Sequence, residues 1–246
     1  PSFPIRGVCR GIAPYLAENA VLVSVTKGIE SGTALRMSQV VEQETNRPVV
    51  VLCGPSHAEE VALGRLTYLT MGCVDNAKAQ MLAEKISSSY VKTKTSQDVI
   101  GIEYASVLKN VYSIAAGIVH GMKKGDNFSA MLVANAIREM ERFLEVVAPR
   151  KRQICDSVYL GDLLVTCYSP LSRNRRLGTL LGKGCTVKSA LNEMTMVAEG
   201  YYAAECIRRS SMRRNIEMPI ADMVWEVLYN NASARDAMLS LTKILK

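Results

Sequence analysis

The feature that most constrains the fold of this chain is a change of hydrophobic patterning near Gln97. Before it, short runs of β-branched residues that end at Gly or Pro alternate with helical stretches, and after it long helical patterns follow one another. Such runs are typical of strands buried on both faces, and their alternation with helices indicates a parallel α/β layer. We therefore expect two domains, an α/β domain at 1–97 and an all-helical domain at 98–246.

The patterning also predicts the individual elements. Strands are expected at 22–26, 49–53, 68–74 and 90–95. Helices are expected at 8–16, 34–44, 56–63 and 76–87 in the first half, and at 102–122, 131–147, 189–210 and 221–228 in the second. Because Lys and Thr alternate along 90–95, we expect this strand at an edge of the sheet.

One part of a nucleotide-binding α/β domain has no counterpart in the sequence. A doubly wound domain holds a pyrophosphate with its first strand, a G-x-G-x-x-G turn and the helix that follows. This fingerprint is absent, and Pro1-Ser2 leads directly into the first predicted helix. We therefore expect either an α/β layer of another kind or a nucleotide-binding domain that lacks its first half.

Composition argues against several classes of protein. No stretch approaches the ~20 apolar residues of a membrane span, and no charged and then apolar leader opens the chain. The seven cysteines are widely spaced and form no C-x-x-C pair, which argues against a disulfide framework or a zinc site. A soluble, cytoplasmic protein without a metal ion is expected.

The net charge of +7 comes with basic clusters at 150–152, 173–176, 208–209 and 213–214. Most such clusters are solvated faces, but an excess of positive charge also favours anionic partners, either nucleic acid or small phosphorylated molecules. Only 6% of the residues are aromatic, and no stacking surface is evident. A small phosphorylated ligand therefore fits better than a nucleic acid.

Two polar segments follow predicted strands, at the edge where open α/β sheets bind their ligands. TKG at 26–28 ends the first strand, and GPSHA at 54–58 leads from the second into a helix. Gly54 permits a close backbone approach, and Ser56 can cap the helix. A solvated lysine and an ordinary capped turn would explain both segments as well, and His57 alone is weak evidence for a metal or a base.

Lys109 and Asn110 lie inside the apolar helix predicted at 102–122. A lysine among such neighbours reaches water poorly unless it faces a cleft, and burial would lower its pKa toward the range useful for proton transfer. The alternative is a lysine that extends along the helix surface to solvent. Asn110 provides a second polar group for a ligand, which favours a functional role.

A further polar segment combines a carboxylate, a hydroxyl, a guanidinium and an amide. It runs from GDLLVTC at 161–167 to SRN at 172–174. The arginine fork suits the oxygens of a phosphate, and Ser, Thr and Asn add neutral hydrogen bonds. The segment therefore indicates a site for a small phosphorylated ligand.

Together these segments resemble the bacterial-type NAD(P)-dependent glycerol-3-phosphate dehydrogenases. The matching pieces are TKGIE, CGPSHAEE, LKNVYSIAAGI, GDLLVTC, SRNRRLG, VAEGY and EMPI. They are spread over almost the whole chain, and their combination is specific although each piece alone is weak. The resemblance implies the second half of a Rossmann-type doubly wound parallel sheet, followed by an all-helical C-terminal domain that binds the substrate.

The resemblance also implies an activity and a site. The activity is interconversion of sn-glycerol 3-phosphate and dihydroxyacetone phosphate with NAD or NADP, which feeds glycerophospholipid synthesis in the cytoplasm, in a homodimer. The matching positions make Lys109, Lys27 and Asp162 catalytic, with Lys109 as the acid–base group. They assign substrate binding to Lys27, Gly54, Ser56, Lys109, Asn110, Asp162, Thr166, Ser172, Arg173 and Asn174. They assign cofactor contacts to Lys27, Ala58, Arg173, Val197 and Glu199.

The sequence departs from the family pattern in three places. The glycine-rich fingerprint is missing, and so is the residue that distinguishes NAD from NADP. The loop usually read as Gly-Leu-Gly-x-Asn is MKKGDN at 122–127, and Asn135-Ala136 stands where Arg-Gly is common, so this loop receives no role. The alternatives are another dehydrogenase with a Rossmann and a helical domain, a non-catalytic basic module that binds nucleic acid, or a truncated piece of a dehydrogenase.

Overall fold

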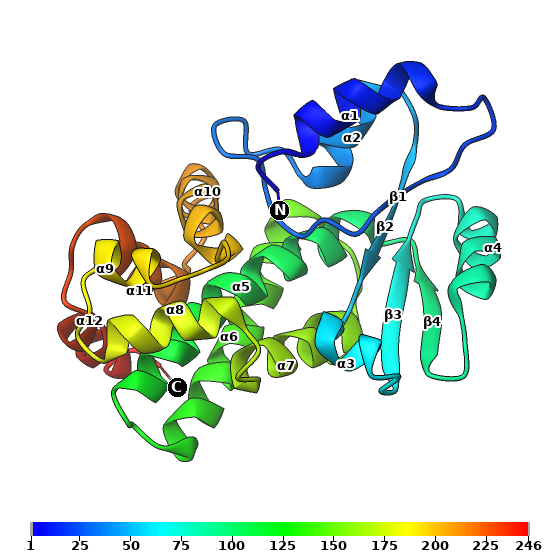
Figure 1. Cartoon of the computed structure of the whole chain (residues 1–246). Coiled ribbons are helices and arrows are strands. Elements are labelled where there is room, and N and C mark those ends of the chain that lie inside the picture. Colours follow the sequence, from blue (N-terminus) through cyan, green and yellow to red (C-terminus); the bar gives the residue numbers. More distant parts are fainter. Residues whose placement is uncertain (1, 246) are drawn as a thin grey trace.

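The four predicted strands form one sheet in the computed structural model, which describes residues 2–245 (Figure 1). The strands are β1 (Leu22–Ser24), β2 (Val49–Cys53), β3 (Thr67–Gly72) and β4 (Val91–Ser96), in that order across the sheet. Their bounds lie close to the predicted ones, and β4 lies at an edge as expected. The α/β character of the first half is therefore confirmed.

One strand pair departs from the expected parallel sheet. β1 pairs with β2 and β3 with β4 in parallel, whereas β2 and β3 are antiparallel, with Val51 opposite Gly72. The connection from β2 to β3 contains only the five-residue helix α3 (Ala58–Ala62). Such a helix is about 7.5 Å long, whereas a five-residue strand spans about 16 Å, so α3 does not return the chain to the start of β2. β3 consequently runs back beside β2.

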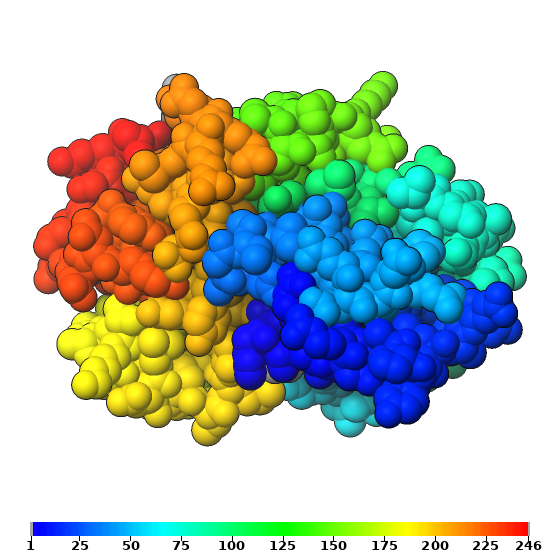
Figure 2. Space-filling model, turned by 90° about the horizontal axis from the view of Figure 1, so that it is seen from above, coloured from blue at the N-terminus to red at the C-terminus, as the bar shows by residue number. Residues whose placement is uncertain are grey.

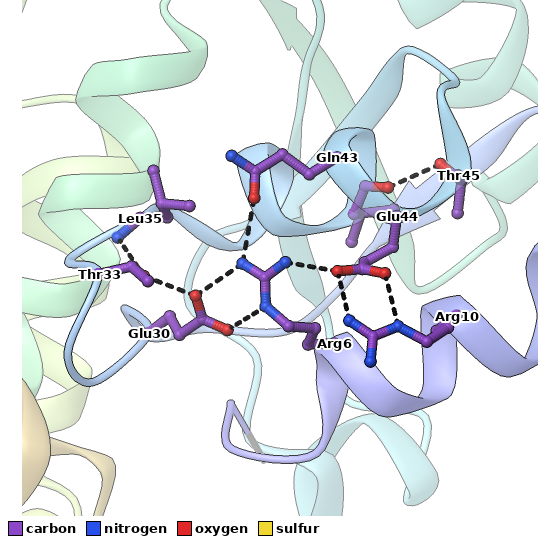
Figure 3. Close-up of polar contacts among 9 residues, drawn as sticks. Arg6, Arg10, Glu30, Thr33, Leu35, Gln43, Glu44 and Thr45 are labelled. Carbon is purple, nitrogen blue, oxygen red and sulfur yellow. Dashed lines mark hydrogen bonds and ion pairs between the residues drawn. The ribbon is translucent and has the colours of Figure 1, made fainter.

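The other helices of the first half lie beyond and beside the sheet (Figure 1). They are α1 (Ile5–Ile12), which continues into a 3-10 turn (Ala13–Tyr15), α2 (Met37–Thr45) and α4 (Asn76–Ile86). Arg6 of α1 forms ion pairs with Glu30 at 2.7 Å and with Glu44 of α2 at 2.5 Å (Figure 3). Partly exposed pairs of this kind add little stability. They nevertheless fix the segment that follows β1 against α1.

Helix α5 (Val99–Gly121) is the centre of the second half (Figure 1). It is apolar on nearly every face, as a fully buried helix is, and the carboxylate of Asp98 caps it by accepting from the backbone N–H of Gly101 at 3.1 Å. The other helices are α6 (Asp126–Val147), α7 (Asp162–Tyr168), α8 (Arg173–Gly182), α9 (Val187–Asn192), α10 (Glu199–Arg214), α11 (Pro219–Tyr229) and α12 (Ala234–Thr242). The all-helical character of the second half is confirmed.

Glycines allow α8 to pack closely on α5. A Cβ at Gly117 of α5 would lie 2.1 Å from the carbonyl oxygen of Arg175, and one at Gly178 of α8 would lie 2.0 Å from that of Ile114. Any side chain at either position would force the two backbones apart. The close approach brings the first residues of α8 next to Asn110 of α5.

The hydrophobic core continues across the boundary near Gln97. The large cluster around α5 includes Ile29, Val51 and Cys53 from the sheet half. Two smaller clusters lie on the sheet, one between β2, β3 and α4 and one between β2, α1 and α2. One side of β2 is thus part of the helical core, which fixes the ends of β1 and β2 relative to α5.

The prediction of one helix at 189–210 is wrong. This region forms two helices, α9 and α10, separated by residues 193–198. The interruption places Gly200 against α5, where a Cβ would lie 2.6 Å from the carbonyl oxygen of Asn110. A continuous helix would not make that contact. Helices α7 and α8 were missed because their sequences were interpreted only as polar motifs.

Candidate active site

A cavity of about 440 Å³ lies where the carboxyl ends of β1 and β2 face α5, α7 and α8. This is the edge of the sheet at which α/β proteins bind ligands. The sheet half lines it with residues 25–27 and 56–59, and the helical half with residues from α5, α7, α8 and the segment before α10. The polar segments that sequence reasoning singled out therefore meet in one place.

A buried ion pair between Lys109 and Asp162 forms the floor of this cavity. Lys109 is 5% exposed and Asp162 is 1% exposed. The Lys109 ammonium donates a hydrogen bond to Oδ1 of Asp162, and Nζ of Lys27 lies 4.0 Å from Oδ2. Within residues 2–245, Oδ2 accepts no hydrogen bond, although it is buried. The cluster therefore carries two positive charges and one negative charge beside the cavity.

The two lysines of this cluster have opposite pKa shifts. Burial lowers the pKa of Lys109 to about 8, and the nearby Lys27 adds to this effect, while Asp162 only partly offsets it. At Lys27 burial is the largest single effect and lowers the pKa, but Asp162, Cys53 and Lys109 together outweigh it and raise the pKa. Burial would raise the pKa of Asp162, but Lys109 and Lys27 together lower it. Asp162 is therefore ionised near neutral pH.

Gly54 positions Lys27 rather than lining the cavity. Its φ is +129°, and a Cβ there would lie 2.7 Å from the carbonyl oxygen of Tyr68 on β3. Only glycine fits this turn without strain. The Lys27 ammonium donates to the Gly54 carbonyl oxygen at 3.2 Å. The close backbone approach that the sequence predicts at Gly54 is thus an approach to strand β3.

The start of α8 provides donors at the opposite side of the cavity. Asn174 donates to the side-chain oxygen of Asn110 and accepts from the backbone N–H of Gly200, both at 2.9 Å. Ser172 caps α8 by accepting from the backbone N–H of Arg175 at 3.2 Å, and Arg173 is exposed beside it. A capped helix N-terminus with an arginine is a typical binding site for an anion.

Ser113 is a supporting residue that sequence reasoning missed. Its hydroxyl donates to the carbonyl oxygen of Thr166 at 2.8 Å and lies 2.9 Å from the hydroxyl of Ser172. It therefore ties α5 to both polar segments behind the cavity. The detectable signal was its spacing, because a residue four positions after Lys109 lies on the same face of a helix.

The structure brings together most of the residues that the resemblance pointed to. The predicted residues that line the cavity are Lys27, Ser56, Ala58, Lys109, Asn110, Asp162, Thr166, Ser172, Arg173, Asn174 and Glu199. Val197 lines a separate pocket of about 280 Å³ next to it. Leu171 and Met196 also line the cavity, and nothing in their sequence context would have identified them. The carboxylate of Glu199 accepts from the backbone and hydroxyl of Ser2.

Two other kinds of site are absent from the part of the chain that the structure describes. No group of three or more His, Cys, Asp or Glu residues could hold a metal ion there. Likewise, no helix between residues 2 and 245 is long and apolar enough to cross a bilayer. The cavity at the strand ends is thus the main candidate site.

Comparison with known proteins identifies close relatives. Residues 1–79 match the family model for the N-terminus of NAD-dependent glycerol-3-phosphate dehydrogenase, and residues 98–239 match the model for its C-terminus. The chain is 34% identical over 245 residues to glycerol-3-phosphate dehydrogenase [NAD(P)+] of Clostridium botulinum, which covers all of this chain and 73% of that protein. It is 38% identical to the protein of the same name from Listeria innocua, over 97% of this chain and 72% of that one.

A solved structure shares the fold over nearly the whole chain. The crystal structure of glycerol-3-phosphate dehydrogenase from Coxiella burnetii superimposes with a TM-score of 0.93 at 29% identity. The superposition covers 99% of this chain and 75% of that one. The arrangement of the sheet half and the helical half therefore recurs in a related protein.

Proposed function

The chain belongs to the NAD-dependent glycerol-3-phosphate dehydrogenase family, and we propose that the buried Lys109–Asp162 pair performs the proton transfer of that family's reaction. The reaction interconverts sn-glycerol 3-phosphate and dihydroxyacetone phosphate with NAD or NADP. The observation that carries the proposal is the position of Lys109. Its ammonium lies at the floor of a polar cavity, with its pKa lowered to about 8. A group with a pKa near the working pH is suited to both giving and taking a proton.

In the direction of reduction, Lys109 acts as the general acid. Its ammonium polarises the C2 carbonyl of dihydroxyacetone phosphate and gives a proton to the oxygen as a hydride arrives at C2. In the direction of oxidation, the neutral amine takes the hydroxyl proton of sn-glycerol 3-phosphate while C2 loses the hydride. A nicotinamide cofactor, when bound, would supply or accept that hydride. A positioned acid–base group typically contributes about 10²–10⁴-fold to the rate.

Asp162 and Lys27 control the protonation and charge at Lys109. Asp162 holds the ammonium in place and keeps its pKa from falling further. Lys27 stays protonated because Asp162 contributes to raising its pKa. It therefore provides a fixed positive charge beside the carboxyl end of β1. That charge would stabilise the negative charge that develops on the C2 oxygen.

The start of α8 is the proposed site for the substrate phosphate. Arg173, Asn174 and Ser172 surround the positive end of the helix, and Thr166 lies beside them. Ser56 and Asn110 complete the polar lining near the substrate carbons. Binding energy from a remote phosphate would orient C2 against Lys109.

The residues present fit the reactive end of a nicotinamide cofactor. The carboxyl ends of the parallel strands β1 and β2 open into the cavity, and Asp162 Oδ2 is buried without a hydrogen-bond donor among the described residues. Lys27 and Ala58 line the cavity from the sheet half, Arg173 and Glu199 line it from the helical half, and Val197 lies in the adjoining pocket. We propose these residues as the cofactor contacts.

We also propose a domain division, an oligomeric state and a metabolic role for this protein. The division into a nucleotide-binding domain at 1–97 and a catalytic domain at 98–246 is supported by the end of β4 at Ser96 and the start of α5 at Val99. A homodimer and a role in cytoplasmic glycerophospholipid synthesis rest on the family resemblance. Light scattering on the purified protein tests the first of these two, with a mass of two chains as the expected result.

The proposed reaction is tested by a substrate panel. Dihydroxyacetone phosphate and other carbonyl compounds, with and without a phosphate, are offered to the natural protein with NADH and with NADPH. We expect dihydroxyacetone phosphate to give the highest kcat/KM with at least one cofactor. A panel in which it ranks last would overturn the assignment in favour of another dehydrogenase of this architecture.

A further inference from the structure

A second pocket, of about 190 Å³, lies between the loop after β1 and the last turns of α10. The loop contributes Gly32 and Thr33, and the helix contributes Arg209, Arg213 and Arg214. Figure 2 shows this boundary from above, where the blue surface of the loop and α2 meets the orange surface of α10. None of these residues lines the active-site cavity.

The charge of this pocket is positive and poorly balanced by the protein. No Asp or Glu is among the residues that line it. Arg209 lies 3.6 Å from the carboxylate of Glu205, whereas Arg213 and Arg214 form no ion pair with any residue in the range 2–245. Arg209 and Arg213 are also four positions apart on one helix, and a like-charge pair at this spacing is destabilising. An anion between these side chains would relieve that repulsion.

Neutral donors are present in the same pocket. Tyr104 of α5 lies among the residues that line it. Within the described residues, its hydroxyl and the backbone N–H groups of Gly32 and Thr33 have no hydrogen-bond acceptor. Gly32 has a φ of +90°, which turns the loop in a conformation suited to glycine. Backbone N–H groups next to guanidinium groups are a common combination for a phosphate.

The one carboxylate within the loop at 25–36, that of Glu30, is already engaged by α1. Glu30 receives a two-point hydrogen bond from Arg6, with both distances 2.7 Å, and a further hydrogen bond from the hydroxyl of Thr33 at 2.5 Å (Figure 3). Its negative charge is therefore matched by Arg6 of α1. Among the described residues Arg213 has no ion-pair partner and Arg214 donates only to Ser210 of its own helix, so both can still bind a ligand.

We propose that this pocket binds a small anion with a phosphate group, separately from the active site. Three guanidinium groups suit a doubly charged phosphate better than a single carboxylate. A concave pocket between two segments also suits a small molecule better than an extended nucleic acid. The loop begins at Lys27 and α10 begins at Glu199, so the bound anion would connect the far ends of two segments that reach the active site. The proposal goes beyond the proposed reaction and does not depend on it.

The proposal is tested by calorimetric titration with inorganic phosphate at constant ionic strength. The starting protein is the Arg173→Ala variant, in which phosphate binding at the active site is weakened. To this variant we add either Arg213→Ala with Arg214→Ala, or the matched control Arg235→Ala with Lys243→Ala. Both pairs remove two exposed positive charges. A parallel titration with glycerol 2-phosphate distinguishes free phosphate from a phosphate monoester as the source of the group.

We expect Arg173→Ala to bind phosphate, and the loss of Arg213 and Arg214 to weaken this binding at least about tenfold, the lower limit for a hydrogen bond to a charged group. The control pair should leave the affinity unchanged. The proposal is overturned if both pairs have the same effect, or if Arg173→Ala binds no phosphate. It is also overturned if a single-stranded oligonucleotide binds more tightly than phosphate and its binding is lost with Arg213 and Arg214.

Discussion

The sheet half and the helical half each place one lysine against the same carboxylate, and the two lysines differ because their surroundings differ. The side chain of Lys109, inside α5, is 7% exposed, and that of Lys27, in the loop after β1, is 25% exposed. Burial prevails at Lys109 and lowers its pKa, whereas at Lys27 the attraction of Asp162, together with Cys53 and Lys109, outweighs burial and raises its pKa. The rigid buried helix thus holds the group that changes its protonation, and the strand-end loop holds a permanent charge.

The largest expected effect comes from removing the buried lysine, Lys109. Lys109→Ala should lower kcat by about 10²–10⁴-fold, because it removes the acid–base group. Lys27→Ala should lower kcat/KM by a smaller amount, about 10–100-fold, the value of one charged hydrogen bond. Steady-state kinetics of both variants measure the difference. Equal losses would show that the two lysines do not have separate roles.

The carboxylate between the lysines controls the pH dependence. Reduction of dihydroxyacetone phosphate needs the Lys109 ammonium, so its rate should fall as the pH rises through about 8. Because Asp162 raises the pKa of Lys109, Asp162→Asn should move this fall to lower pH. The measurement is a pH–rate profile of wild type and variant with the same cofactor. A midpoint that stays in place or moves to higher pH would contradict the assigned role of Asp162.

A third expected effect lies at the far side of the cavity, where the helical half alone provides the donors. Arg173→Ala should weaken binding of dihydroxyacetone phosphate by about 1.5–3 kcal/mol, the value of a hydrogen bond to a charged group. The effect should be smaller for a carbonyl substrate without a phosphate, because only the proposed cofactor contact of Arg173 is then lost. The kcat/KM values for both substrates measure it. If the variant lost the same factor with both substrates, Arg173 would not be a phosphate ligand.

The smallest expected effects are changes in stability that report on the packing of the two halves. Gly178→Ala should destabilise the fold by about 1–3 kcal/mol, because its Cβ would lie 2.0 Å from the Ile114 carbonyl oxygen. Gly7→Ala in α1 meets no atom within 4 Å, so it should stabilise the fold by about 0.4–1 kcal/mol. Urea unfolding of the two variants tests this contrast. Similar changes in the same direction would mean that the close contact of α5 with α8 is not required.

Local patterning predicted much of this fold because most elements are determined by their own residues. The run at 49–53 is apolar and ends at Gly54, and it forms β2 with those bounds. The apolar stretch around Lys109 forms α5 with a buried lysine, as expected. In such segments burial and periodicity agree, so the sequence alone is informative.

The remaining features depend on contacts between distant segments. The antiparallel pairing of β3 follows from the short connection through α3, and the start of α10 follows from the contact of Gly200 with α5. Local propensity contains neither fact. The pairing of Lys109 with Asp162 joins residues 53 positions apart, and only the family resemblance pointed to it. Ser113 was missed because a serine among small residues suggests packing rather than a polar contact.

The central claim is that Lys109 transfers the proton, and one pair of pH–rate profiles tests it most directly. The rate of NADH or NADPH oxidation with dihydroxyacetone phosphate is measured across pH for the natural protein, and the rate of sn-glycerol 3-phosphate oxidation is measured in the same way. The account predicts that reduction falls and oxidation rises through a pKa near 8, and that Lys109→Ala abolishes both limbs. A Lys109→Ala variant that keeps the wild-type rate and the wild-type profile would contradict it.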